Sequence, residues 1–142
     1  MPSLSPLLSN FTPEDLAQLS SFGESRSYTK GDVIIREGEP NGHLYLVLKG
    51  KMEVMKAGDS GPQRIAEIGT SGSLGEMSIF DPGPASATVQ AAGEVEVWRI
   101  SAANLDRLHE SRPKVAFRLV SRISACLARR LRDLNQKLLD VS

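Results

Sequence analysis

The sequence is poor in the side chains from which catalytic and metal centres are usually built. It has one cysteine and two histidines among its 142 residues. The single cysteine, Cys126, excludes an internal disulfide, and its place among apolar residues at helical spacing predicts a buried structural thiol. His43 stands in a turn before an expected strand and His109 near the end of an expected helix, so we expect two surface histidines and no bound metal.

The chain also lacks the motifs of several other protein classes. No apolar run approaches the roughly 20 residues of a membrane helix, and residues 1–10 have no basic start before their leucines, so we expect a cytoplasmic protein without a membrane anchor. Neither a nucleophile elbow nor a Walker loop is present, and residues 69–73 lack the lysine that a phosphate-binding loop uses. These absences predict a protein that is not an enzyme and carries no cofactor.

What the sequence does contain is typical of one small globular domain over residues 1–142. Hydrophobic residues make up 40% of the chain and charged residues 24%. The net charge is zero, but residues 1–106 hold 8 basic and 14 acidic side chains, whereas residues 107–142 hold 9 and 3. The basic C-terminal part allows two interpretations, contact with nucleic acid or the solvated outer face of a paired helix, and we favour the second.

Short runs of β-prone residues dominate the middle of the chain. Thr12 and Pro13 first start a short helix over residues 12–22. Glycine-bearing turns then separate short runs over residues 24–100, a pattern typical of a sandwich or barrel. The runs are Ser25–Lys30, Val33–Arg36, Leu44–Lys49, Met52–Lys56, Arg64–Ile68, Ala85–Ala91 and Val95–Ile100. Residues 44–48 are apolar at every position, which predicts a central strand covered on both faces.

The C-terminal part returns to helical periodicity. Ser101 is a suitable cap for a helix over residues 101–110, and Pro113 suits the first turn of a second helix over 113–140. That second helix would be about 42 Å long, more than a roll of this size can cover. Its first half has apolar residues in steps of four, namely Val115, Leu119 and Ile123, and we expect it to pack on the roll. Its second half has a seam with steps of 4, 3, 4 and 3, which predicts pairing with a second copy; the seam is Leu127, Leu131, Leu134, Leu138 and Val141.

The most informative segment is residues 72–91. It reads Gly-Ser-Leu-Gly-Glu-Met-Ser-Ile-Phe from Gly72, and after a short loop Pro-Ala-Ser-Ala-Thr-Val-Gln-Ala from Pro84. This order resembles the phosphate-binding cassette of the cyclic-nucleotide-binding family, and nearly the whole chain is similar to the bacterial Crp/Fnr sensors. The other matching stretches are Tyr28–Ile34, Glu37–Glu39, Leu44–Gly50 and Ala128–Leu131.

The resemblance implies a mostly β fold with some α-helix: an eight-stranded jelly roll, the cyclic-nucleotide-binding β-roll, with a short N-terminal helix and a long C-terminal dimerisation helix. It implies a homodimeric regulatory sensor that binds cyclic AMP or cyclic GMP. Transcription factors of this family continue into a helix-turn-helix module. This sequence stops at Ser142, so direct DNA binding is not expected.

The resemblance also implies which residues form the site. Backbone N–H groups of a short helix would meet the cyclic phosphate, Gly75 would let the backbone approach, and Glu76 would accept the ribose hydroxyl. From the long helix, Arg130 would lie near the cassette glutamate, and Leu134 and Asn135 near the base. The residues implied for phosphate and ribose are Gly75, Glu76, Met77, Ser78, Ala85, Ser86 and Thr88.

One departure from the family pattern affects the mechanism. Ala85 stands where the family keeps an arginine that clamps the phosphate, and no lysine or arginine occurs between Arg64 and Arg99. Loss of such a charge-assisted contact costs about 1.5–3 kcal/mol, so cyclic nucleotide binding should be weak. Ser86 and Thr88 remain as neutral donors facing the ligand. Two hypotheses follow: a sensor of a cyclic nucleotide or a related small ligand, or a ligand-independent dimeric scaffold with a degenerate cassette.

Overall fold

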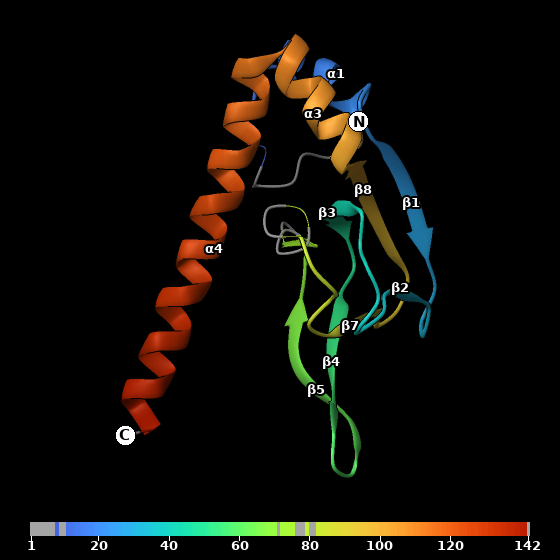
Figure 1. Ribbon diagram of the computed structural model, residues 1–142, viewed down its shortest axis with the longest axis vertical. Coiled ribbons are helices and arrows are strands. Elements are labelled where there is room, and N and C mark those ends of the chain that lie inside the picture. The colour runs from blue at the N-terminus through green and yellow to red at the C-terminus, as the bar shows by residue number, and fades with distance from the viewer. Residues whose placement is uncertain (1–7, 9–10, 71, 76–78, 80–81, 142) are drawn as a thin grey trace.

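Among the described residues, eight strands form two four-stranded antiparallel sheets in the computed structural model of this chain (Figure 1). The structure describes residues 8, 11–70, 72–75, 79 and 82–141, without the side chains of residues 139–141. One sheet has the strand order β1 (Glu24–Tyr28), β8 (Val95–Ser101), β3 (His43–Lys49) and β6 (Ser73–Leu74). The other has the order β2 (Val33–Ile35), β7 (Thr88–Ala91), β4 (Met52–Gly58) and β5 (Gly61–Ile68).

The helices of the described chain begin where the local chemistry predicts. They are α1 (Pro13–Ser20), α3 (Ala102–Ser111) and α4 (Pro113–Val141). At α1, the Thr12 hydroxyl accepts a hydrogen bond from the Asp15 N–H, and the Asp15 carboxylate accepts one from the Thr12 N–H, a reciprocal cap. At α3, the Ser101 hydroxyl accepts from the Asn104 N–H at 3.1 Å. The expected jelly roll with a short N-terminal and a long C-terminal helix is confirmed.

Strand β3 divides the core into two parts. Its residues 44–48 are all buried, as the unbroken apolar run predicted. Because successive side chains of a strand point to opposite faces, Leu44, Leu46 and Leu48 pack with the helices, whereas Tyr45 and Val47 pack inside the roll. The roll interior also contains Val89 and Ala91 of the opposite sheet, which closes the two sheets on each other.

Helix α4 is attached to the roll by one face of its first half. Val115, Leu119 and Ile123 are at most 4% exposed and belong to the same core cluster as the helix-facing leucines of β3, which confirms the predicted packing. Cys126 is only half-buried at the edge of this cluster, so the expected full burial of the thiol is wrong. In Figure 1, α4 runs from the end of the molecule that holds α1 and α3 along one side of the strands.

Among its described residues, helix α4 also carries four large exposed apolar side chains, three of them on its second half, which we call the apolar row. Its members are Phe117, Leu131, Leu134 and Leu138, between 53% and 73% exposed. Leu127, which the seam pattern included, is half-buried and contacts the core cluster. Phe117 is exposed although it lies on the first half of the helix, which was expected to pack on the roll.

Three details of the strands differ from the expectation. The two-residue strand β6 pairs with β3 through Tyr45 and Leu46 and was not predicted. Strand β5 begins at Gly61, earlier than expected, because the hairpin with β4 continues to its tip. Strand β7 begins only at Thr88: the Ala85 N–H donates to the Glu39 carbonyl and the Ala85 carbonyl accepts from Gly38, so this part bonds to a loop instead of the sheet.

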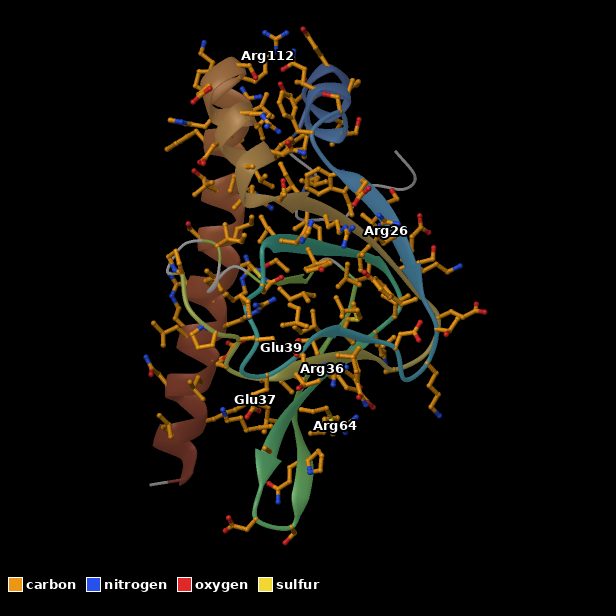
Figure 2. The ribbon with its side chains drawn as sticks, turned by 45° about the vertical axis from the view of Figure 1, so that its right-hand side comes forward. Arg26, Arg36, Glu37, Glu39, Arg64 and Arg112 are labelled. Carbon is orange, nitrogen blue, oxygen red and sulfur yellow. The ribbon has the colours of Figure 1, made fainter. Side chains whose placement is uncertain are left out.

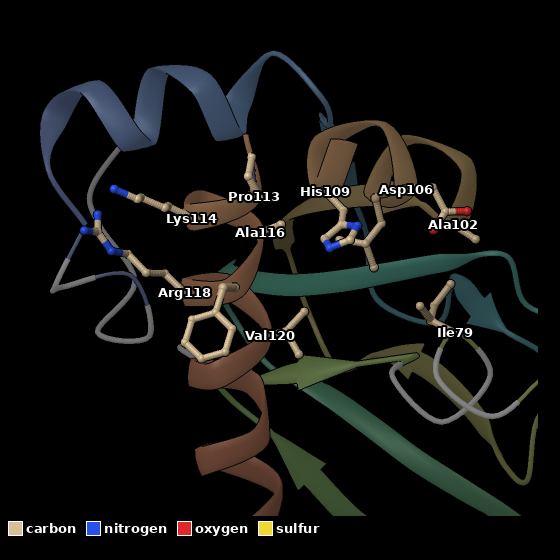
Figure 3. A pocket seen from close by; sticks show the side chains of 11 residues that line it. Ile79, Ala102, Asp106, His109, Pro113, Lys114, Ala116, Arg118 and Val120 are labelled. Atoms are coloured by element: carbon tan, nitrogen blue, oxygen red, sulfur yellow. The ribbon is translucent and has the colours of Figure 1, made fainter. Parts of the chain in front are cut away.

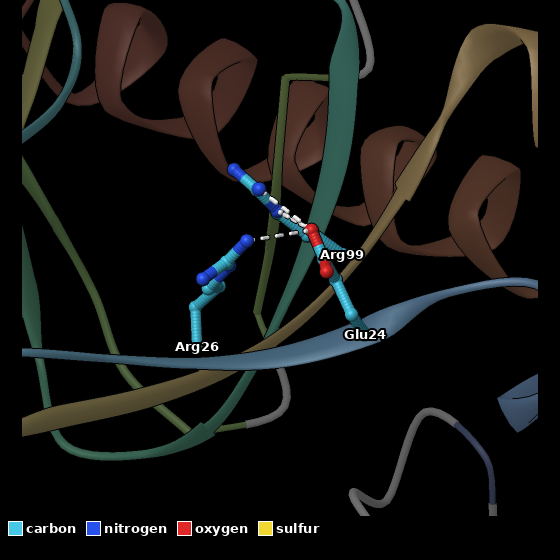
Figure 4. A network of polar contacts seen from close by, with 3 residues as sticks. All are labelled: Glu24, Arg26 and Arg99. Carbon is cyan, nitrogen blue, oxygen red and sulfur yellow. Dashed lines mark hydrogen bonds and ion pairs between the residues drawn. The ribbon is translucent and has the colours of Figure 1, made fainter.

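An ion-pair network holds strand β1 against β8. The Arg99 guanidinium donates two hydrogen bonds to the Glu24 carboxylate at 2.8 and 2.6 Å, and Arg26 donates a third at 3.2 Å (Figure 4). These bonds, that of Arg99 above all, hold the pKa of Glu24 below its ordinary value, against the opposing effect of burial.

Within the described part of the chain, we find no helix with the length and apolarity needed to cross a membrane.

Gly23 provides a test of the packing around the single tryptophan. A Cβ atom at this position would overlap the ring of Trp98, which is 1% exposed and has no room to move. We expect Gly23→Ala to lower the free energy of unfolding by about 1–3 kcal/mol, as measured by urea denaturation. Gly93→Ala is the control, because a Cβ there would meet nothing within 4 Å. Equal stability of the two variants would contradict this packing.

Candidate functional site

A cavity of about 150 Å³ opens inside the roll where the cassette meets the second sheet. We call it the cassette cavity. Cassette residues make up one part of its wall, and inward-facing residues of β2, β4 and β5 make up the other. Its lining is Ile35, Asn41, Val54, Ile68, Ser73, Leu74, Gly75, Ala85, Ser86, Ala87 and Val89. None of these described lining residues is charged, so the wall offers a ligand apolar contact and neutral hydrogen-bonding groups.

Gly75 is required by the backbone of the cavity wall itself. It has φ of +85°, in the left-handed region that favours glycine. A Cβ atom there would also overlap the carbonyl oxygen of His43. Asn41, which the sequence analysis missed, braces this corner: its side-chain amide donates to the His43 carbonyl at 2.8 Å and to the Gly75 carbonyl at 3.5 Å. The backbone conformation and close packing of this corner are thus sufficient reasons for a glycine at position 75, without any role in ligand binding.

Ala85 points its methyl group into the cavity wall. It is 9% exposed and packs with the interior of the roll. Because its N–H and carbonyl are both bonded to the Gly38–Glu39 loop, its backbone holds the wall but offers no free donor. An arginine at this position would extend from the wall beside Gly75, which is where the resemblance places the phosphate. The role of Ala85 as the position of a missing phosphate-binding cation stays a prediction.

Thr88 lies outside the lining of the cassette cavity. The Thr88 hydroxyl accepts a hydrogen bond from the Glu37 N–H at 3.0 Å and so anchors the loop after β2. Since the cavity is inside the roll, the inward residues Ala87 and Val89 line it and their neighbour Thr88 faces the other way. The expectation that Thr88 faces this pocket is wrong, whereas Ser86, at the end of the loop before β7, does line it.

A lysine that the sequence analysis did not consider lies against the cassette. Lys56 of β4 donates a hydrogen bond from its ammonium to the Ser86 carbonyl at 2.6 Å. Its Nζ is also 3.9 Å from a carboxylate oxygen of Glu37. Figure 2 shows Glu37 beside Arg36 and Glu39 on the loop after β2, with Arg64 on the β4–β5 hairpin. The absence of basic residues between Arg64 and Arg99 therefore does not leave the cassette without a nearby cation.

Arg130 connects α4 to the cassette. Its guanidinium donates a hydrogen bond to the Ser73 carbonyl at 2.8 Å, over a sequence separation of 57 residues. Ser73 is fully buried, and its own hydroxyl has no hydrogen-bond partner among the described residues. Leu134 and Asn135 lie one turn further along α4 and are exposed. The structure thus brings Arg130 to the cassette but does not bring these two residues to the described cavity wall.

Residues 76–78 of the cassette are outside the described residues. The predictions for Glu76, Met77 and Ser78 therefore stay predictions. Ile79, which follows them, is described: its N–H donates to the Gly75 carbonyl at 3.3 Å and its side chain packs against the helix-facing core. The cassette is consequently connected to the helix layer at two positions, through Ile79 and through the Ser73 carbonyl.

A larger groove, of about 830 Å³, lies between α3, the start of α4 and Ile79 (Figure 3). Leu105, Phe117 and Val120 give it an apolar floor, and Asp106 and Lys114 are also part of its lining. Phe117 of the apolar row is thus also part of the lining of this groove.

The two histidines lie at separate places, His43 at the start of β3 and His109 in the lining of the α3–α4 groove. Burial of its ring, together with the nearby charge of Arg99, holds the pKa of His43 below its ordinary value. His43 is half-buried, which corrects its expected place on the surface. In the described part of the chain, histidine, cysteine and carboxylate side chains form no group of three that could hold a metal ion.

Comparison with known families agrees with this geometry. A model of the family described as "cyclic nucleotide-binding domain" matches residues 25–112. The chain belongs to this family. As a cyclic nucleotide-binding domain, it is 31% identical over 130 residues to a CRP-like cAMP-activated global transcriptional regulator of Mycobacterium tuberculosis, covering 91% of this chain and 56% of that protein.

Two further proteins are similar over most of this domain. The cyclic AMP receptor protein of Thermus thermophilus is 33% identical over 135 residues, covering 94% of this chain and 61% of that protein. The crystal structure of a cyclic nucleotide-binding domain from Methylobacillus flagellatus superposes with a TM-score of 0.86 at 27% identity, covering 97% of this chain and 78% of that one. The domain thus spans 56% and 61% of the length of the two curated relatives.

Gly75 allows a test of the cavity wall. We expect Gly75→Ala to destabilise the domain by about 1–3 kcal/mol, because a non-glycine residue is strained at this positive φ and its Cβ meets the rigid His43 backbone. Urea denaturation measures the change. Gly83→Ala, on the same cassette but without positive φ or a neighbour within 4 Å, should leave the stability unchanged. A stable Gly75→Ala protein would mean that the corner relaxes and that its glycine is dispensable to the fold.

Proposed function

We propose that this domain is a regulatory sensor, which binds a cyclic nucleotide or a related small ligand in the cassette cavity and signals through α4. One observation carries the proposal: Ser73 and Gly75 line the cavity, and the Ser73 carbonyl is at the same time the acceptor of Arg130 from α4. A ligand that shifts this part of the wall would displace the hydrogen-bond acceptor of the helix. Binding and helix position are thereby coupled through one residue.

The lining of the cavity favours a ligand with an apolar face and few charges. The purine of cyclic AMP or cyclic GMP suits the aliphatic wall formed by Ile35, Val54 and Val89. Its phosphate would meet neutral groups near Ser86, since Ala85 supplies no cation. We therefore propose weak binding of the cyclic nucleotides, and that both they and less charged relatives are candidate ligands.

Helix α4 supplies the proposed output surface. The exposed leucines of the apolar row, Leu131, Leu134 and Leu138, lie on the second half of α4, beyond the residues that pack on the roll, and Phe117 is exposed on its first half. Exposed apolar side chains on a helix are typical of an interaction site, and the spacing of the three leucines is that of a two-stranded coiled coil. We propose that the apolar row of a second copy covers this row, which makes the domain a homodimer.

The neutral lining of the cavity also favours the alternative, a ligand-independent dimeric scaffold. In that case the roll only presents α4, and the cassette is a structural remnant in which Gly75 is kept for the backbone. The titration described below distinguishes the two functions, because only the sensor binds ligand.

The position of Ala85 gives a direct test of the sensor function. We expect wild-type protein to bind cyclic AMP or cyclic GMP weakly and Ala85→Arg to bind about tenfold to a hundredfold more tightly, because the new guanidinium can pair with the cyclic phosphate. Isothermal titration calorimetry of both proteins measures this change. Ser25→Arg, which adds the same charge on an exposed part of β1 in the other sheet, should bind like the wild type. Absence of binding by all three proteins would overturn the sensor function and favour the scaffold.

The apolar row allows a second test, of the oligomeric state. We expect the domain to sediment as a dimer at micromolar concentration and the double variant Leu131→Glu with Leu134→Glu to sediment as a monomer, because four carboxylates would then meet in the seam. Arg129→Glu changes an exposed residue outside the row and should remain dimeric. A wild-type protein that sediments as a monomer would contradict the pairing.

A further inference from the structure

Lys56 lies on the face of β4 that lines the cassette cavity. Strand β4 pairs with β7 through Met52 opposite Ala91 and Val54 opposite Val89, and all four side chains point into the roll. The register between β4 and β5 shifts once, because Val54 pairs with Ala66 whereas Met55 pairs with Arg64. The unpaired extra residue is therefore in β5, and side chains along β4 still alternate between the two faces. The next inward position after Val54 is therefore Lys56.

The ammonium group of Lys56 is at the rim of the cavity. It donates to the carbonyl of Ser86, a lining residue, at 2.6 Å. Half of its side chain remains exposed. Ser86 immediately follows Ala85, the position at which the cation is missing. A flexible lysine side chain thus supplies positive charge one residue from that position, from a strand that is remote in sequence.

The present contacts of Lys56 leave it free to turn towards a ligand. The Glu37 carboxylate is 3.9 Å from Nζ, and an exposed ion pair at such a distance contributes little stability. The same Glu37 oxygen also accepts a hydrogen bond from the Ala57 N–H at 3.2 Å, so the carboxylate keeps a partner when the ammonium moves. The Ser86 carbonyl likewise becomes accessible to water, because Ser86 is exposed.

We propose that Lys56 is the cation that contacts the anionic phosphate of a ligand in the cassette cavity and so takes over part of the role that Ala85 cannot fill. This assignment rests on the proposed sensor function. It makes Lys56 a specificity-determining residue, which favours a cyclic nucleotide over the corresponding uncharged nucleoside. The Glu37 carboxylate weakens this contact, because it competes with the phosphate for the Lys56 ammonium.

Calorimetric titration of cyclic AMP and adenosine into Lys56→Met tests the assignment. We expect the affinity for cyclic AMP to fall about three- to tenfold, less than for a buried arginine because the ammonium is half exposed, and the affinity for adenosine to stay unchanged. The loss should shrink at high salt, which screens the interaction. Lys51→Met is the matched control: Lys51 is exposed in an ion pair with Glu67, away from the cavity lining, and its removal should leave both affinities unchanged.

Glu37→Gln keeps the test decisive if Lys56→Met folds poorly, because it removes the competing charge, leaves Lys56 in place and should raise the affinity for cyclic AMP. If Lys56→Met does fold, adding Ala85→Arg to it should restore the lost affinity, because the new guanidinium serves the same phosphate.

The outcomes separate the two proposals. If the wild type and Lys56→Met bind cyclic AMP equally, Lys56 is not the cation, although the sensor function stands. If Lys56→Met weakens adenosine as much as cyclic AMP, the lysine only braces the Ser86 backbone and the assignment is overturned. If neither the wild type nor Ala85→Arg binds cyclic AMP, both proposals fail together.

Discussion

The burial of both faces of β3 is the constraint on which the rest of the structure depends. Its leucines at 44, 46 and 48 pack with the helices, while Tyr45 and Val47 close the roll on the other side. Every other element is placed relative to this strand: β8 and β6 pair with its two edges, and α4 is held by Val115, Leu119 and Ile123 against its outer face. The cassette strand β6 thereby lies at the edge of the same sheet whose outer face carries α4.

This arrangement makes the cassette a connection between the roll and the helix. Strand β6 is only two residues long, yet Leu74 faces the roll interior while the Ser73 carbonyl accepts a hydrogen bond from Arg130. Ile79 adds an apolar contact between the same segment and the helix layer. A wall with so few hydrogen bonds of its own is easier to shift than a long central strand. A ligand-induced displacement of residues 72–79 is therefore expected to reach α4 before it reaches the rest of the roll.

The sequence predicted those features that depend on local periodicity. The helix caps at Thr12 and Ser101, the central β3 and the roll-facing half of α4 all follow from neighbouring residues, and the structure confirms them. Strand β6 was missed because a strand of two residues is too short to show an alternating pattern of apolar and polar side chains. The predicted orientation of Thr88 was wrong because alternation along a strand does not say which of its two faces points into the roll. Asn41 and Lys56 were missed because their contacts join segments that are distant in sequence, and no local pattern marks them.

If the domain is a sensor, occupancy of the cassette cavity is transmitted to α4. Hydrogen exchange of the backbone amides, measured with and without saturating cyclic AMP, detects this transmission. We expect slower exchange with ligand both in the cassette, residues 72–91, and in the part of α4 around Arg130. Slower exchange in the cassette with unchanged exchange along α4 would contradict it, because the ligand would then be bound without any effect on the helix.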